Sequence, residues 1–62
     1  MSGIFSATLT DGKPITFVAQ NVICLIELPE ETAVVTYANE WHVKEPYRAV
    51  NIGLYYALGE EP

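Results

Sequence analysis

The residues best suited to hold a ligand are concentrated in one stretch, Tyr37–Arg48, which reads YANEWHVKEPYR. The candidate binding residues in it are Trp41, His42, Lys44, Tyr47 and Arg48. Aromatic rings stack on bases or on peptide side chains, and arginine grips a phosphate or carboxylate through two parallel hydrogen bonds. The stretch therefore predicts a binding site for a protein partner or for a small anionic ligand such as a nucleotide.

A structural interpretation of the same stretch stays open. Alternation along 40–44 places Trp41 and Val43 on one face of a strand and His42 and Lys44 on the other. Trp41 is then either a core residue or a member of a site completed by a second subunit. The Arg48 side chain, in the first turn of a predicted helix, lies where backbone N–H groups favour an anion.

The residue types of the chain are poorly suited to a catalytic site or a metal site. The chain has one His and one Cys, and it contains no glycine-rich phosphate loop, no HExxH and no GxSxG. General acid–base catalysis needs converging titratable groups, and a familiar zinc site needs more ligands than these. We expect a protein that is not an enzyme and has no catalytic residues, no metal and no cofactor.

Charge and cysteine content narrow the partners further. The 62 residues carry a net charge of −5 with three basic residues, which is unsuited to phosphate backbones. The longest apolar run is too short to cross a bilayer, and a lone Cys24 favours a reducing compartment. We expect a cytoplasmic protein that binds neither nucleic acid nor membranes, with Cys24 a small buried hydrophobe.

The elements that must position these residues are short strands followed by one helix. Asp11-Gly12 between apolar runs predicts a hairpin, Pro14 predicts a strand start or a sheet edge, and Pro46 predicts a helix start. The predicted strands cover about 4–9, 14–18, 22–28, 32–37 and 40–44, with a helix at 46–58 and an acidic tail at 59–62. Short connections make this an antiparallel β-meander with the helix packed on the sheet, an α+β fold in a single domain of residues 1–62.

Apolar residues left over after the core is assigned predict self-association. In the third strand, Val22, Cys24, Ile26 and Leu28 are expected to face inward, and the opposite residues outward. The helix has an inward stripe of Tyr47, Val50, Leu54, Ala57 and Leu58, and further apolar residues on its far side. The predicted oligomer interface is Ile23, Leu25, Ile52 and Tyr56.

Three segments, LTDGKPITFVAQNV, IELPEETAVVTY and WHVKEPYRAV, resemble the FlbD family of small proteins from bacterial flagellar and motility gene clusters. The shared pattern is a glycine turn, an Asn before an apolar strand, an acidic turn, and Val-x-Glu before a helix. The resemblance covers nearly the whole chain, implies a small β-rich fold and supplies no catalytic residues. Short phage and bacterial proteins share this layout.

The predicted function is that of a small, non-enzymatic and homo-oligomeric phage or bacterial protein, an adaptor or inhibitor acting through protein–protein contact. The alternative is a viral protein that sequesters a nucleotide signal in a pocket between subunits. A structural subunit of a larger assembly is a third possibility, which the motility resemblance implies.

Overall fold

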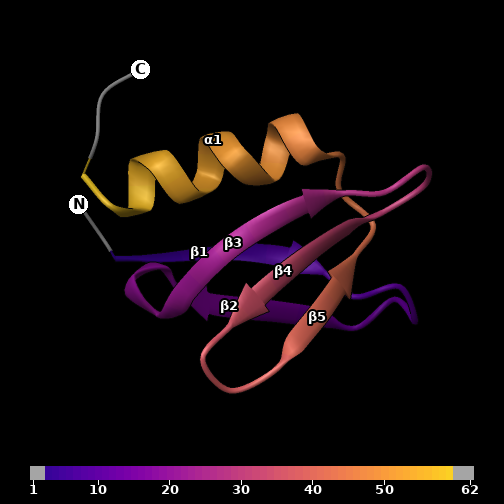
Figure 1. The fold of residues 1–62 in the computed structure, drawn as a ribbon, viewed down its shortest axis with the longest axis horizontal. Coiled ribbons are helices and arrows are strands. Elements are labelled where there is room, and N and C mark those ends of the chain that lie inside the picture. The colour runs from indigo at the N-terminus through magenta and orange to yellow at the C-terminus, as the bar shows by residue number, and fades with distance from the viewer. Residues whose placement is uncertain (1–2, 60–62) are drawn as a thin grey trace.

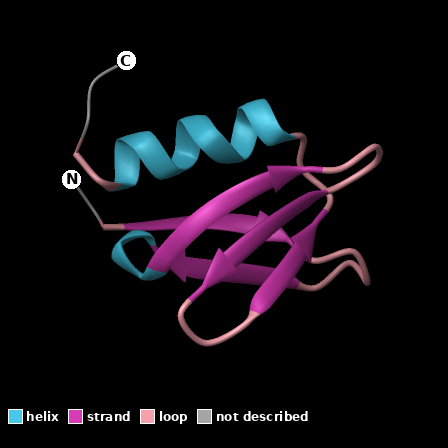
Figure 2. Ribbon diagram, viewed as in Figure 1, coloured by secondary structure: helices cyan, strands magenta, loops and turns pink. Residues whose placement is uncertain are grey.

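The computed structural model describes residues 3–59, which form five strands, one 3-10 helix and one α-helix (Figure 1). In chain order these are β1 (Ile4–Thr8), β2 (Pro14–Val18), η1 (Ala19–Asn21), β3 (Val22–Glu27), β4 (Thr32–Thr36), β5 (Glu40–Val43) and α1 (Tyr47–Ala57). Every strand and the α-helix lie within the predicted ranges, and the α+β class with a C-terminal helix packed on antiparallel strands is confirmed (Figure 2). Residues 60–62 of the predicted tail lie outside the described part.

The first two strands form an antiparallel hairpin around Asp11 and Gly12. Gly12 adopts a φ of 94°, which residues with a side chain rarely tolerate. Its N–H donates to the Leu9 carbonyl at 2.8 Å, and the Asp11 carboxylate accepts a bond from the Lys13 N–H at 3.0 Å. This turn chemistry is what the Asp-Gly pair predicted.

The strands do not form one continuous meander, because η1 turns the chain between β2 and β3. The result is a two-stranded sheet, β1-β2, and a three-stranded sheet, β3-β4-β5. The two sheets meet where Leu9 pairs with Val43, and the Lys44 N–H donates to the Thr8 carbonyl at 2.8 Å. The end of β1 thus lies beside β5, and β2 and β3 are the outer strands.

The core lies between the two sheets and the helix. Phe5 of β1 stacks on Phe17 of β2 with ring centroids 5.3 Å apart, and the pair packs with the fully buried Val34 and Val43 of the other sheet. In Figure 1 α1 runs along β1 and β3, the strands with which it makes most of its contacts. The helix contributes its predicted inward residues, with Val50 and Ala57 buried and Leu54 packed against them. Leu58, at the end of the predicted stripe, is 42% exposed.

The predicted faces of the third strand are wrong, because a β-bulge interrupts its pairing between Val22 and Cys24. A bulge adds one residue to one strand, and every later side chain then changes face. Leu25 therefore packs against the core, as Val22 does, whereas Cys24 and Ile26 are exposed. Cys24 is not the buried hydrophobe that was expected, and Leu25 does not point outward as a free interface residue.

The helix ends follow from their sequence, with one exception. Pro46 is the N-cap, and Gly59, with a φ of 86°, ends the helix as predicted. The exception is Glu45, the residue before the N-cap, whose carboxylate accepts a hydrogen bond from the Thr8 N–H of β1 at 2.8 Å. In the part of the chain that the structure describes, no helix has the length and hydropathy to span a membrane.

Candidate functional site

The predicted binding residues do not converge on one site. Trp41 borders a groove beside β2, while Lys44 and Tyr47 border a second cavity near the start of α1. Arg48 is exposed on the helix and lines neither cavity. The strand alternation is confirmed, because Trp41 packs against the core and the Lys44 side chain is exposed on the other face.

The groove beside Trp41 is the stronger candidate for a binding site. It encloses about 290 Å³ and has no charged side chain in its lining. The lining residues are Ile15, Thr16, Phe17, Val18, Asn21, Thr36, Tyr37, Ala38 and Trp41. Because Tyr37 is 78% exposed and Trp41 half-buried, both rings can cover an apolar group placed in the groove.

Strand β2 forms one wall of this groove, and within residues 3–59 no strand pairs with its outer edge. The Leu9 N–H bonds to the Lys13 carbonyl and the Ala19 N–H to the Gly3 carbonyl. Along an antiparallel ladder, residue pairs that exchange backbone hydrogen bonds alternate with pairs that do not. The two bonds at the ends of the hairpin set this alternation, and it places Thr16 and Val18 at non-hydrogen-bonded positions opposite β1. Their backbone N–H and C=O groups therefore point away from β1, toward the open edge.

The far wall of the groove is a three-residue loop between β4 and β5 that one hydroxyl organises. The Thr36 Oγ1 donates to the Asn39 carbonyl at 2.9 Å and accepts from the Asn39 N–H at 3.1 Å. The Asn39 side chain accepts from the Glu40 N–H at 2.8 Å. A two-residue turn through Asn39 was predicted, and the extra residue places Tyr37 on the rim of the groove.

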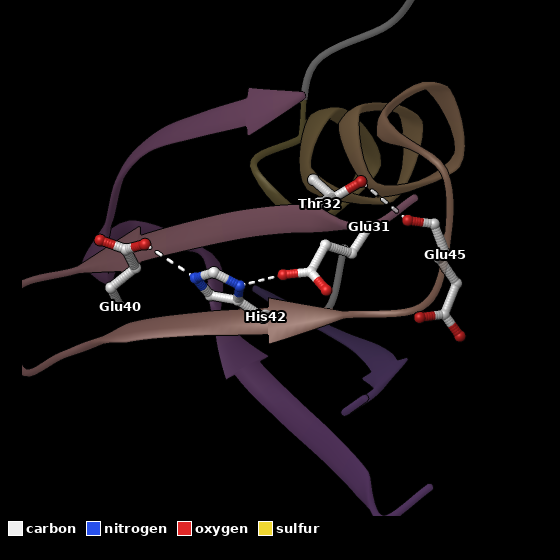
Figure 3. Close-up of polar contacts among 5 residues, drawn as sticks. All are labelled: Glu31, Thr32, Glu40, His42 and Glu45. Atoms are coloured by element: carbon white, nitrogen blue, oxygen red, sulfur yellow. Dashed lines mark hydrogen bonds and ion pairs between the residues drawn. The ribbon is translucent and has the colours of Figure 1, made fainter. Parts of the chain in front are cut away.

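His42 is held by two carboxylates on the outward face of β5 (Figure 3). Its Nε2 lies 2.8 Å from the Glu40 carboxylate, and its Nδ1 contacts Glu31 from the β3–β4 turn. The hydrogen bonds with Glu40 and then Glu31 raise the pKa of His42. A neutral imidazole has one N–H, so donation to both carboxylates requires the imidazolium form. His42 therefore ties the β3–β4 turn to β5.

A second polar link joins β1, β4 and the segment before the helix (Figure 3). The fully buried Thr32 donates its hydroxyl to the Glu45 carbonyl at 2.8 Å, while the Glu45 carboxylate accepts from Thr8. Burial acts to raise the pKa of Glu45, but hydrogen bonds from Thr8 and the nearby Lys44 outweigh it and leave this pKa lowered. Glu45 is thus an ionised structural group.

The second cavity, of about 230 Å³, is acidic. Glu27, Glu30 and Glu31 border it, with Lys44 as the one cation in its lining. Tyr47, Leu28, Pro29 and Pro46 complete it. Three carboxylates against one ammonium repel an anion, so the placement of Lys44 and Tyr47 argues against a nucleotide phosphate here.

The sequence did not predict a binding site at the edge of β2. Pro14 predicted an edge position, and Pro14–Val18 carries no charge, whereas natural edge strands are usually blunted by charged residues, bulges or covering elements. That absence of charge was the available signal. Among residues 3–59 no group of three or more His, Cys, Asp or Glu side chains is arranged to hold a metal ion.

Comparison with known proteins adds no relative to this description. No protein-family model, no curated protein and no solved structure matches the chain. The resemblance to the FlbD family stays a prediction from the quoted segments, and the function has to be argued from the groove and the edge themselves.

Proposed function

We propose that this chain is a non-enzymatic binding domain, an adaptor or inhibitor, that docks an extended segment of a protein partner along the free edge of β2. The observation that carries the proposal is the open, uncharged edge of β2 directly beside the Trp41 groove. An added strand satisfies the outward N–H and C=O groups of Thr16 and Val18, which is the chemistry of β-strand addition.

The groove can select among the side chains of a bound peptide, which backbone pairing alone cannot do. In an added strand every second side chain points to the same face, and one of them reaches the uncharged space between Trp41 and Tyr37. An aromatic or aliphatic side chain suits this lining, because burying a charge there without a partner is costly. The expected ligand is an extended peptide with an apolar anchor.

The state of His42 also supports a binding role over catalysis. Both of its ring nitrogens are engaged by carboxylates, so the ring is not set against Cys24, which lies exposed on β3. A lone exposed thiol is compatible with the reducing cytoplasm, where we place the protein. The nucleotide-sequestering alternative gains no specific support, since Arg48 and Lys44 border no common cavity.

The test uses a displayed library of extended peptides and the fluorescence of Trp41, the single tryptophan of the chain. Peptides that are enriched on the wild-type domain are titrated against Thr16→Pro and Thr16→Val. Thr16→Pro removes an outward N–H without removing a backbone hydrogen bond to β1, since the Ser6–Thr16 backbone pair is a non-bonded one. The hydroxyl–hydroxyl bond between Ser6 and Thr16, at 3.4 Å, is lost in both variants. We expect it to weaken binding by about tenfold or more.

Thr16→Val is the matched control, because it keeps the N–H and suits a strand. It is expected to bind like the wild type. If no peptide is enriched, or if the enriched peptides bind Thr16→Pro as tightly as Thr16→Val, strand addition at this edge is wrong.

A further inference from the structure

The outer face of α1 carries a pattern that is unrelated to the β2 edge. Arg48, Ile52 and Tyr56 recur at intervals of four residues, so they form one stripe along the helix. All three are exposed, Ile52 at 46% and Tyr56 at 57%, and they lie opposite the buried Val50 and Ala57. This stripe is larger and more apolar than a solvated helix face needs.

The stripe is complementary to a second copy of itself in the antiparallel orientation. Ile52 is the middle residue of α1, five residues from each end. A two-fold axis at Ile52 places Ile52 against its own counterpart. It places Arg48, four residues before the axis, against the Tyr56 of the other copy, four residues after it. A guanidinium on a tyrosine ring is a favourable cation–π pair.

The flanking positions follow the same symmetry. Tyr55 lies three residues after Ile52 and on the same flank of the stripe as Arg48, so the axis brings the Tyr55 ring of one copy alongside Arg48 of the other. Both are exposed, Tyr55 at 46%. Antiparallel packing also brings each Arg48 toward the C-terminal end of the other helix, whose carbonyl groups favour a cation.

Charge explains why a second copy contacts this face and not another. Two chains of net charge −5 repel each other. The sequence from Pro46 to Gly59 has no Asp or Glu, and Arg48 is its one charged residue. Contact through α1 therefore brings no carboxylate of residues 46–59 into the interface.

We infer that two copies of this protein associate through an antiparallel contact between their α1 helices, centred on Ile52. This contact is independent of the β2 edge, and either proposal can fail without the other. The surface of a single short helix is well below the roughly 800 Å² per partner of a standard interface, so we expect a weak dimer, with a Kd on the order of 100 µM.

Sedimentation velocity of the full chain, from about 10 µM to about 1 mM, measures the association. Ile52→Asp places two like charges on the axis and is expected to weaken the dimer by about tenfold or more. Ile23→Asp is the matched comparison, because Ile23 is similarly exposed, at 56%, and was also predicted in the oligomer interface, but it lies on β3. A contact through α1 leaves Ile23 outside the interface, so this variant is expected to associate like the wild type. A wild-type chain that stays monomeric at about 1 mM overturns the inference, as does equal weakening by the two variants.

Cross-linking keeps the test informative if a charged variant unfolds. In a Cys24→Ser background, Ile52→Cys places two thiols across the axis, where close Cα atoms permit a disulfide. Mild oxidation is expected to give a covalent dimer with Ile52→Cys and mostly monomer with Ile23→Cys. Equal or preferred cross-linking at position 23 contradicts the helix contact.

Discussion

Two sides of the molecule are built on different principles. The acid-free side comprises β1, β2, η1 and α1, and no Asp or Glu occurs in the described residues of these elements. The acid-bearing side spans 27–45 and includes β4, β5 and the turns around them. It contains Glu27, Glu30, Glu31, Glu40 and Glu45. The acids looked scattered along the sequence, but the fold gathers three of them around one cavity.

The two sides are also held together differently. On the acid-free side the buried side-chain contacts are packing contacts, such as Phe5 on Phe17 and Phe5 beneath Gly53, while the Ser6–Thr16 hydroxyl bond at 3.4 Å is exposed. On the acid-bearing side, side-chain hydrogen bonds link separate segments, such as Thr32 with Glu45 and His42 with Glu31. Packing is non-directional and tolerates a range of partners, whereas a buried hydrogen bond fixes one geometry.

This division has a functional consequence. The edge of β2 and the stripe on α1, the two surfaces proposed for contact, both belong to the acid-free side. The acid-bearing side carries five of the eight acidic residues of the chain, and the net charge of −5 opposes non-specific association.

The largest expected effect on stability comes from removing the Phe5 ring, which packs on the acid-free side. Phe5→Ala deletes a buried ring that stacks on Phe17, and we expect a loss of about 3–5 kcal/mol in the free energy of unfolding. A domain of this size has about 3–9 kcal/mol in total, so much of the population unfolds. Urea titration followed by circular dichroism measures this. Val18→Ala, at a neighbouring exposed position, is the control, and equal losses would contradict the packing assignment.

On the acid-bearing side the matching experiment is Thr32→Val. It keeps the shape of the buried side chain but removes the donor to the Glu45 carbonyl. An unsatisfied polar group in such a position costs about 1–3 kcal/mol. Thr32→Ser keeps the hydroxyl and is expected to lose less of the free energy of unfolding. A Thr32→Val domain as stable as the wild type would show that the hydrogen bond is not what holds this side.

A stabilising substitution at Gly53 tests how closely α1 packs on β1. In Gly53→Ala the new methyl group lies 3.7 Å from the Phe5 Cβ, an ordinary contact distance. Since alanine suits a helix interior better than glycine, we expect a gain of about 0.5–1 kcal/mol in the free energy of unfolding. Gly12→Ala, where φ is 94°, is expected to lose stability. A loss with Gly53→Ala would mean that α1 packs closer to β1 than described.

The smallest expected effect concerns pH. The pKa of His42 is raised in the folded state by its hydrogen bonds with Glu40 and Glu31. The stability from the imidazolium is therefore fully present below the unfolded value of about 6.5 and is lost as pH rises through the higher folded pKa. Glu31 and Glu40 are the carboxylates that contact the ring.

The measurement is the difference in the free energy of unfolding between the wild type and His42→Gln at several pH values. The difference should favour the wild type more at about pH 6 than at about pH 8. A difference that does not change with pH would mean that the two carboxylates do not hold the imidazolium.

Much of the fold could be predicted because its signals are local. The Asp11-Gly12 turn, the strand alternation around Trp41 and the helix limits at Pro46 and Gly59 each depend on a few neighbouring residues. The faces of β3 could not be predicted, since the bulge after Val22 changes the alternation and has no strong local signature. Leu25 and Cys24 exchanged their expected roles for this reason alone.

The candidate site could be predicted only in part. Trp41 was singled out by its type, and it does line the groove. Lys44 and Tyr47 do border one cavity, but it is acidic and separate from the groove of Trp41, and Arg48 lines neither, so sequence proximity did not become a common site. The backbone groups of Thr16 and Val18 carry no signature in side-chain chemistry.

The sequence by itself determined the element order, the α+β class, the inward face of the helix and the charge of the chain, because periodicity, turn chemistry and composition act over short distances. Tertiary structure alone decided that β2 is an open edge, that Glu45 bonds Thr8 and not the helix end, and that His42 lies between two carboxylates. Those outcomes depend on which distant segments are brought together, and pairing between distant segments is set by the whole core.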